Sequence, residues 1–144
     1  MQQSLTNNIE IEVKFSDVDM LGVVWHGNYI RYFEDGREAF GKQYGLGYMD
    51  VYNQGFIVPI VNVQCDYKRF LRYEDKLIIE TTYIPTESAK INFTYRLLNA
   101  QTGELVVKGS SMQIFVHRDN FELQLTNPDF FLGWKQKHGL SSCP

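Results

Sequence analysis

The chain alternates apolar and polar residues over several short segments, a pattern typical of half-buried β-strands. In residues 9–19, every second residue from Ile9 to Phe15 is apolar, so we expect these side chains to share one face. The same period of two recurs in the second half of the chain. The predicted strands are 9–19, 57–69, 76–84, 90–98, 104–117 and a short sixth segment at 121–125.

Glycine, proline and asparagine predict irregularities within and between these strands. Pro59 lacks an N–H group, so residues 57–69 should bend there or lie at a sheet edge. Gly109 interrupts 104–117 and predicts a β-bulge. The segment NAQTG, residues 99–103, predicts a hairpin turn between two neighbouring strands.

A helical period replaces the alternation between Asn28 and Tyr44. Aromatic residues recur there at helical spacing, Asn28 is a favourable N-cap, and Gly45 ends the pattern. Gly36 in the middle costs roughly 1 kcal/mol of helix stability, and close packing on a sheet would explain it. A short helical turn is expected at 48–54 and a last helix at 128–138, with Pro128 in its first turn.

The order of one strand, a long helix and then four or five strands predicts an α+β fold. Short connections favour antiparallel pairing. One long helix cannot bury its apolar side alone, whereas a single sheet of five to six strands curling around it would bury both surfaces. We expect one domain over residues 1–144, a length that suits a single core.

Composition and charge exclude several classes of function. The net charge of −3 and the lack of a basic stripe argue against a nucleic-acid surface. No apolar run approaches the ~20 residues of a membrane span. The first ten residues lack the charged-then-apolar order of a signal peptide, so we expect a cytoplasmic protein. Two distant cysteines give neither a disulfide framework nor zinc spacing, and three scattered histidines predict no metal site.

The stretch from Phe15 to Tyr29, FSDVDMLGVVWHGNY, mixes polar and apolar residues in a way that no plain strand or helix needs. Asp19 lies where the chain leaves the first strand, and Gly22 allows a tight turn. His26 then falls at the helix start, where backbone N–H groups lack intrahelical partners. These N–H groups and the helix dipole can stabilise an anion on a carbonyl oxygen. Asp19 would be a nucleophile or a general base, and a thioester suits so sparse a site because its thiol leaves readily.

Simpler interpretations stand beside this one. Aspartates are common at turns, and Asp17 is expected to support the loop. Residues 36–42, GREAFGK, have the spacing of a phosphate-binding loop but lie within a helix and lack the following Ser or Thr. Cys65 is expected to be a small core residue. The basic cluster around Lys68 to Arg72 is either a solvated rim or the binding site of an anionic group.

The motif F-x-D-x-D-x-x-G-V-V-x-H-x-N-Y resembles that of the 4-hydroxybenzoyl-CoA thioesterase-like family, which includes the acyl-CoA thioesterases of the YbgC type. Glu34, Arg37, Pro59 and the Tyr73-x-Asp75 segment extend the resemblance over nearly the whole chain. It implies the hotdog fold, in which a curved antiparallel sheet wraps one long central helix. It also implies a homodimer or homotetramer with sites between subunits, an acyl-CoA substrate, and no cofactor, since CoA is part of the substrate.

The resemblance assigns roles to individual residues. It makes Asp19 the catalytic carboxylate and an N–H near His26 the oxyanion donor, with the His26 ring orienting water or substrate. Val18, Met20, Leu21 and Trp25 depart from the family pattern and leave the acyl group open. The expected substrate-binding residues are Gly22, Val24, Trp25, Asn28, Tyr29, Pro59 and Lys90, with Lys68, Arg69 and Ser88 as weaker candidates for the CoA phosphates. The alternatives are a hotdog hydratase or dehydratase and a non-catalytic module that binds acyl thioesters.

Overall fold

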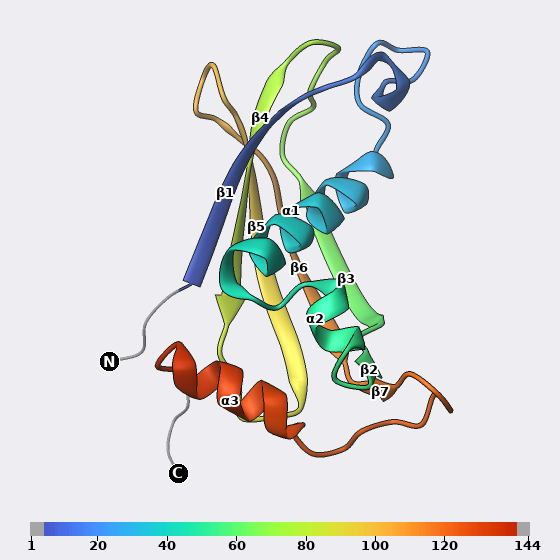
Figure 1. Ribbon diagram of the computed structural model, residues 1–144. Coiled ribbons are helices and arrows are strands. Elements are labelled where there is room, and N and C mark those ends of the chain that lie inside the picture. Colours follow the sequence, from blue (N-terminus) through green and yellow to red (C-terminus); the bar gives the residue numbers. More distant parts are fainter. Residues whose placement is uncertain (1–4, 141–144) are drawn as a thin grey trace.

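The computed structural model describes residues 5–140, in which five antiparallel strands form a sheet with a long helix across one face (Figure 1). The order in the sheet is β1-β4-β5-β6-β3, so β1 and β3 are its two edges. Two further short strands, β2 and β7, pair with each other. The strands are β1 (Leu5–Glu12), β2 (Phe56–Ile57), β3 (Ile60–Tyr67), β4 (Lys76–Ile84), β5 (Lys90–Asn99), β6 (Leu105–Ile114) and β7 (Val116–His117).

Strands β4 and β5, both internal to the sheet, bury one face each, as their alternation predicts. The buried residues are Leu77, Ile79, Thr81 and Tyr83 in β4 and Ile91, Phe93, Tyr95 and Leu97 in β5. The predicted hairpin after β5 is also confirmed. Gly103 adopts a positive φ of 75°, and its N–H bonds to the carbonyl of Asn99 at 2.7 Å.

Helix α1 (Asn28–Tyr44) lies across the buried face of the sheet (Figure 1). Its bounds agree with the prediction, and Gly45 ends it with a φ of 75°. Gly36 marks the close approach that was expected, because an added Cβ would lie 2.3 Å from Oγ1 of Thr81. The ring of Phe33 stacks on that of Tyr95 with centroids 4.2 Å apart. Packing against β1, β4 and β5 therefore fixes the position and direction of α1.

Two shorter helices complete the described chain. Helix α2 (Tyr48–Tyr52) follows α1, and α3 (Asp129–Lys137) lies at one end of the sheet (Figure 1). Pro128 directly precedes α3, one residue before its first turn. Trp134 of α3 is buried and donates a 2.8 Å hydrogen bond from its indole nitrogen to the carbonyl of Tyr44, which ties α3 to the end of α1. Among residues 5–140, none of these helices has the length and apolar character needed to cross a bilayer.

The first strand differs from its prediction. β1 pairs with β4 from Leu5↔Tyr83 to Glu12↔Lys76 and ends there, whereas residues 9–19 were expected to form the strand. Phe15–Asp17 instead form a short 3-10 helix, η1, and Phe15 is 76% exposed. The apolar alternation thus runs past the last ladder pair, and hydrogen bonding rather than residue pattern decides where the strand ends.

Two further predictions for strands are wrong. Gly109 lies in regular register opposite Cys65 and Tyr95 and forms no bulge, and the register shifts lie between Ile60 and Asn62 and between Leu97 and Leu98. An added Cβ at Gly109 would lie 2.3 Å from the Phe33 ring, so close packing of α1 explains this glycine. Residues 121–125 form no strand, because Leu123 makes only an isolated bridge to Val116.

The predicted antiparallel sheet is confirmed. The main sheet has five strands, within the expected range of five to six, and all its pairings are antiparallel. The described residues contain three α-helices, of which α1, with 17 residues, is the longest. Helix α2 packs against β2, and α3 contacts β4 through the rings of Trp134 and Tyr83.

Candidate active site

Asp17 holds together the loop between β1 and α1. Only 3% of its surface is exposed. Its carboxylate accepts hydrogen bonds from the N–H of Lys14 at 2.9 Å and the hydroxyl of Tyr32 at 3.0 Å, and it forms an ion pair with Arg31. Burial alone would raise the pKa of Asp17, but these hydrogen bonds and the charge of Arg31 together lower it below its ordinary value. This aspartate supports the loop, as the sequence predicts.

Asp19 lies in a tight turn that follows directly. Val18 and Val24 form a bridge, the N–H of Asp19 bonds to the carbonyl of Val23 at 2.9 Å, and Gly22 adopts a φ of 80°. The carboxylate of Asp19 is half-buried and accepts one hydrogen bond, from the N–H of Leu21 at 2.8 Å. Gly22 thus provides the turn expected of it, and the turn presents the carboxylate of Asp19 at the surface.

The carbonyl of Asp17 connects this turn to the start of α1. It accepts hydrogen bonds from the N–H of Trp25 at 3.0 Å and from the side-chain amide of Asn28 at 2.8 Å. Asn28 is therefore not the N-cap that was predicted. Gly27 occupies that position, and none of the described side chains caps the helix. The amide of Asn28 instead fastens the aspartate loop, residues 13–27 between β1 and α1, to the helix.

The backbone at the helix start is available to a ligand. Within residues 5–140, no group accepts a hydrogen bond from the N–H of His26 or of Gly27. The His26 carbonyl accepts a 3.0 Å hydrogen bond from the hydroxyl of Tyr67 at the end of β3. The Trp25 ring lies over Gly27, where an added Cβ would be 2.1 Å from a ring atom. Free donors at a helix N-terminus favour an anion, and the partial positive charge there adds to this preference.

The aromatic side chains around the helix start are partly open to solvent. The imidazole of His26 is exposed and lies between the rings of Trp25 and Tyr67, at centroid distances of 5.0 Å and 6.4 Å. Trp25 is 50% exposed. Met20 and Leu21, at the tip of the turn, are 102% and 83% exposed, so a ligand or a second chain can cover them.

Two of the expected substrate-binding residues lie in the interior. Val24 and Tyr29 are 3% and 2% exposed. The N–H of Val24 bonds to the carbonyl of Leu71, and the hydroxyl of Tyr29 accepts a hydrogen bond from the N–H of Leu71 at 3.1 Å. The Val24 backbone and the Tyr29 hydroxyl thus hold residue 71 against the loop, and the two buried side chains have little surface left for a substrate.

The remaining expected residues divide between the two ends of the sheet. Lys68 and Arg69 follow Tyr67 directly and lie near the helix start; both are exposed, and Arg69 pairs with Glu104 at 3.2 Å. Lys90 lies opposite Ile114, at the other end of β6. Pro59 and the exposed Ser88 lie at that far end too, just before β3 and β5. A single chain therefore does not bring Lys90 and Pro59 together with Asp19 and His26.

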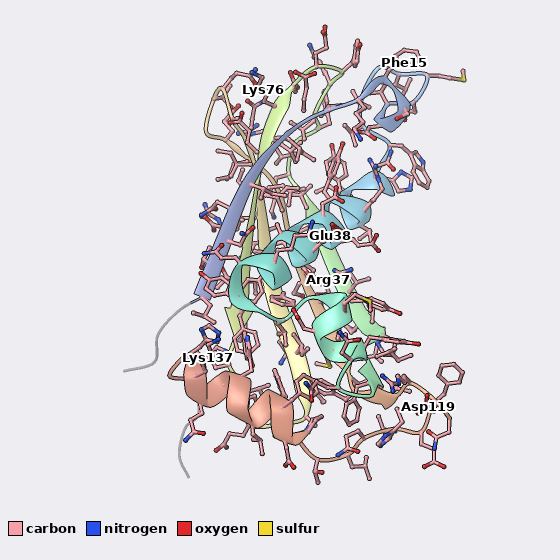
Figure 2. The ribbon with its side chains drawn as sticks, in the orientation of Figure 1. Phe15, Arg37, Glu38, Lys76, Asp119 and Lys137 are labelled. Atoms are coloured by element: carbon pink, nitrogen blue, oxygen red, sulfur yellow. The ribbon has the colours of Figure 1, made fainter. Side chains whose placement is uncertain are left out.

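A cleft of about 530 Å³ opens at the Pro59 end of the chain. Pro59 and Gln113 line it together with Glu34 and Arg37 of α1, whereas Asp19 and His26 do not. Figure 2 shows Arg37 and Glu38 on α1, well away from Phe15 in the aspartate loop. The sequence indicates Arg37 only as part of the family resemblance, because nothing in a helical period shows that an arginine faces a cleft. Among the described residues, no three His, Cys, Asp or Glu side chains gather in a way that could hold a metal ion.

Comparisons with known proteins relate this arrangement to enzymes. Residues 13–134 match the family model described as the thioesterase-like superfamily. YneP of Bacillus subtilis, a candidate acyl-CoA thioesterase, is 33% identical over 113 residues, covering 78% of this chain and 81% of YneP. The crystal structure of the DHNA-CoA thioesterase from Staphylococcus aureus is 28% identical and superposes with a TM-score of 0.82, covering 94% of this chain and 92% of that one.

A more distant structure shares the fold. A variant of 4-hydroxybenzoyl-CoA thioesterase, crystallised with 4-hydroxybenzoyl-CoA, superposes with a TM-score of 0.78 at 20% identity, covering 90% of this chain and 98% of that one.

Proposed function

Since this chain belongs to the thioesterase-like superfamily, we propose that it hydrolyses the thioester bond of an acyl-CoA to a carboxylic acid and free CoA. The resemblance noted in the Phe15–Tyr29 motif is thereby confirmed at the level of the family. One observation carries the proposal beyond the family: the carbonyl of Asp17 fastens the turn that bears Asp19 to a helix start with free N–H groups.

The proposed reaction uses these two features together. The N–H of His26, aided by Gly27, binds the thioester carbonyl oxygen and stabilises the negative charge that develops on it. Asp19 either attacks the carbonyl carbon, giving an anhydride that water then cleaves, or removes a proton from an attacking water molecule. In both routes the C–S bond breaks, CoA leaves as a thiolate and takes up a proton. Because the thiol pKa is near ~8.5, its departure needs no strong general acid.

We propose that two chains pair through β3 to complete the site. Within residues 5–140, β3 bonds only to β6, and its other edge is open. Val63 and Tyr67 share the face of β3 on which the Tyr67 ring contacts Tyr29 of α1, yet they are 40% and 49% exposed, and Val61, beside the register shift, is 51% exposed. An apolar open edge of this kind is typical of a surface that pairs with another strand.

The opposite edge of the sheet is protected from such pairing. β1 exposes Asn8, Glu10 and Glu12, and the two charged residues disfavour the approach of a second strand. β3 is therefore the better edge for a homodimer. Whether two such dimers form a homotetramer is a separate question that the mass in solution answers.

Antiparallel pairing of β3 with its copy would bring Lys90 and Pro59 of one chain close to Asp19 and His26 of the other. A two-fold axis through the middle of β3 places Ile60 of one chain beside the end of the partner strand. That end carries the tyrosine that bonds to the His26 carbonyl, so the partner's helix start would lie beside the cleft at Pro59. Lys90, with Ser88, would then approach the partner's active site, where it can contact a CoA phosphate. Lys68 and Arg69 would serve the same role from the chain that holds Asp19.

The proposed mechanism requires only this chain's own residues, water and the substrate. We propose no metal and no cofactor, and we place the enzyme in the cytoplasm, where acyl-CoA is its partner. The domain boundaries 1–144 stay a prediction. We take α1 as the central helix of a hotdog fold, with α2 and α3 as additions at its end.

One experiment separates the proposal from its alternatives. The protein is incubated with a saturated acyl-CoA and a thiol reagent that absorbs light on reaction with free CoA. A thioesterase releases CoA, whereas a hydratase finds no double bond and a binding module only retains the ester. Steady release of CoA across a screen of aliphatic, branched and aromatic esters supports the proposal. Absence of release with every ester would favour a binding module or a hydratase.

A further inference from the structure

We propose that Arg37 selects the acyl group, by donating hydrogen bonds to an oxygen acceptor at the far end of an acyl chain held in the cleft beside Pro59. This inference rests on the proposed function, because it concerns the substrate of the same site. The acceptor is a hydroxyl or a carboxylate oxygen, and the experiment below distinguishes the two.

The cleft has the size and the lining of a small-molecule site. Its volume of about 530 Å³ lies within the range of roughly 300–1,000 Å³ that is usual for ligand pockets. Val51, Val58 and Phe93 provide apolar walls, and Arg37 is the one cation among the described residues that line it. An apolar cleft with a single strong donor favours a ligand that is apolar along most of its length and polar at one point.

Arg37 has unused donors in this cleft. The guanidinium is half-buried, and its Nη1 donates a 2.9 Å hydrogen bond to the hydroxyl of Tyr95. Within residues 5–140, no carboxylate lies within ion-pair distance of Arg37, whereas Arg31, Arg69, Arg96 and Arg118 each have one. A guanidinium carries five N–H donors, so a ligand oxygen can bind several of those that remain.

Two buried residues hold Arg37 in place. Tyr95 and Ser111 are 0% and 4% exposed, and their hydroxyl oxygens lie 2.5 Å apart. Burial raises the pKa of Tyr95, so its hydroxyl stays neutral and forms no ion pair with Arg37. The arginine is thus fixed at one end and has no ion-pair partner within residues 5–140, which is the arrangement expected of a selective donor rather than of a mobile surface cation.

The distance along α1 places Arg37 at the far end of the substrate. Arg37 lies about 14 Å beyond Asn28 along the axis, at about 1.5 Å per residue, too far for a short acyl group bound at the start of its own helix. In the proposed dimer, however, the partner's helix start lies beside Ile60, which lines the same cleft. An acyl group whose carbonyl is bound by the partner would extend toward Arg37.

The acidic residues near Arg37 affect which acceptor is preferred. Glu34 and Glu38 also line the cleft, and both are exposed. Glu38 pairs with Lys42 at 3.4 Å, which reduces its effect on the cleft. The negative charge of Glu34 would repel a carboxylate more than a hydroxyl. The structure therefore favours a hydroxyl acceptor over a carboxylate, although Arg37 can bind either.

The test compares matched pairs of esters. Benzoyl-CoA is measured against hydroxybenzoyl-CoA, and butyryl-CoA against succinyl-CoA, for the parent protein and for Arg37→Met. We expect the parent to prefer the oxygen-bearing member of at least one pair by roughly tenfold or more in kcat/KM, the scale of one charge-assisted hydrogen bond. In Arg37→Met, the ratio of kcat/KM between the oxygen-bearing ester and its partner ester should fall to about one. Lys137→Met removes an exposed cation from α3, which does not line the cleft, and should keep the parent's ratio.

The outcomes decide the inference separately from the proposed function. Equal rates within both pairs for the parent, or an unchanged ratio in Arg37→Met, would overturn it. If Arg37→Met does not fold, Arg37→Lys retains the charge without the planar fork, and an undiminished ratio in that variant overturns it equally. If no ester is hydrolysed, the proposed function fails, and the inference is judged on the dissociation constants of the corresponding CoA thioethers. In that case, a tenfold lower dissociation constant for the oxygen-bearing thioether, lost in Arg37→Met, supports the role of Arg37. Equal dissociation constants within both pairs contradict it.

Discussion

The hydroxyl of Tyr67 donates a 3.0 Å hydrogen bond to the carbonyl oxygen of His26, and so connects the open edge strand β3 to the start of α1. That carbonyl belongs to the same peptide group as the N–H of Gly27. The hydrogen bond therefore fixes the orientation of this N–H and strengthens it as a donor. Partial burial and the neighbouring Cys65 raise the pKa of Tyr67 to about 12, so the hydroxyl remains a donor over the whole working range of pH.

Loss of this hydroxyl should slow turnover more than it weakens binding. Tyr67→Phe leaves the ring in contact with Tyr29 but frees the peptide after His26. We expect kcat to fall by roughly 3- to 30-fold, with KM changed by less than about twofold, because the donors act mainly on the charge of the transition state. Tyr73→Phe is a matched control, since Tyr73 is 49% exposed and packs edge-on against Phe15. A rise in KM with an unchanged kcat would contradict this role.

Asp17 should contribute to stability and not to chemistry. Asp17→Asn removes the charge that pairs with Arg31 and weakens the bonds from Lys14 and Tyr32. We expect the free energy of unfolding at pH 7 to fall by about 1–3 kcal/mol, which is the usual cost of weakening the hydrogen bonds of a buried charged group. Chemical denaturation measures this, and Asp119→Asn, at a side chain that is 86% exposed, should have almost no effect.

The difference between Asp17→Asn and the parent should depend on pH. The pKa of Asp17 is lower in the folded than in the unfolded state, where it is near ~3.9. The stabilisation is therefore complete above the unfolded pKa and is lost as the pH falls through the folded pKa. The free energies of unfolding of the two proteins should differ at pH 7, and this difference should become smaller near pH 3. A difference that grows toward acid pH would show that the carboxylate is not stabilised in its charged form.

Close packing at Gly36 should outweigh helix propensity. Gly36→Ala gains about 1 kcal/mol of propensity, but its Cβ would lie 2.3 Å from Oγ1 of Thr81 and 2.9 Å from Cγ2 of Ile79. We expect a net loss of about 1–3 kcal/mol from overpacking. Gly133→Ala in α3 has no atom within 4 Å of its added Cβ and should be neutral or stabilising. Stabilisation of both variants to the same extent would show that α1 does not press on the sheet.

Pairing through β3 is tested by a charge at its exposed face. Val63→Lys places an ammonium group where a second chain would cover it, and should raise the dimer dissociation constant by on the order of 10² or more. Light scattering should then give the 16.8 kDa mass of one chain instead of twice that mass, and kcat should fall with it. Thr94→Lys lies on the exposed face of the internal strand β5 and should leave the dimer intact. A monomeric parent with full activity would exclude a site shared between chains.

The sequence predicts the fold well where one physical pattern decides the structure. The apolar alternation of Leu77 to Tyr83 and the helical period from Asn28 to Tyr44 both follow directly from burial, and both elements form where they were predicted. Gly109 was assigned to a bulge because a glycine in a strand has two explanations. Only the position of Phe33, which depends on how α1 lies across the sheet, distinguishes them.

The candidate site was predicted only in part, for a similar reason. Asp19 and Gly22 lie in a tight turn beside the helix start, since the short spacing to His26 leaves few other arrangements. The amide of Asn28 bonds to Asp17 instead of capping α1, and local propensity gives no sign of this long-range contact. The separation of Lys90 from Asp19 depends on strand order, which a single sequence without an alignment does not provide.

The turnover of Asp19→Asn tests the central claim most directly. Asparagine keeps the size of the side chain and can still accept the hydrogen bond from Leu21, but it can neither attack a thioester nor take a proton from water. For the ester that the parent hydrolyses fastest, we predict that kcat falls by on the order of 10² or more while the melting temperature stays nearly constant. CoA release by this variant at the parent's rate would contradict the assignment of Asp19 and the mechanism built on it.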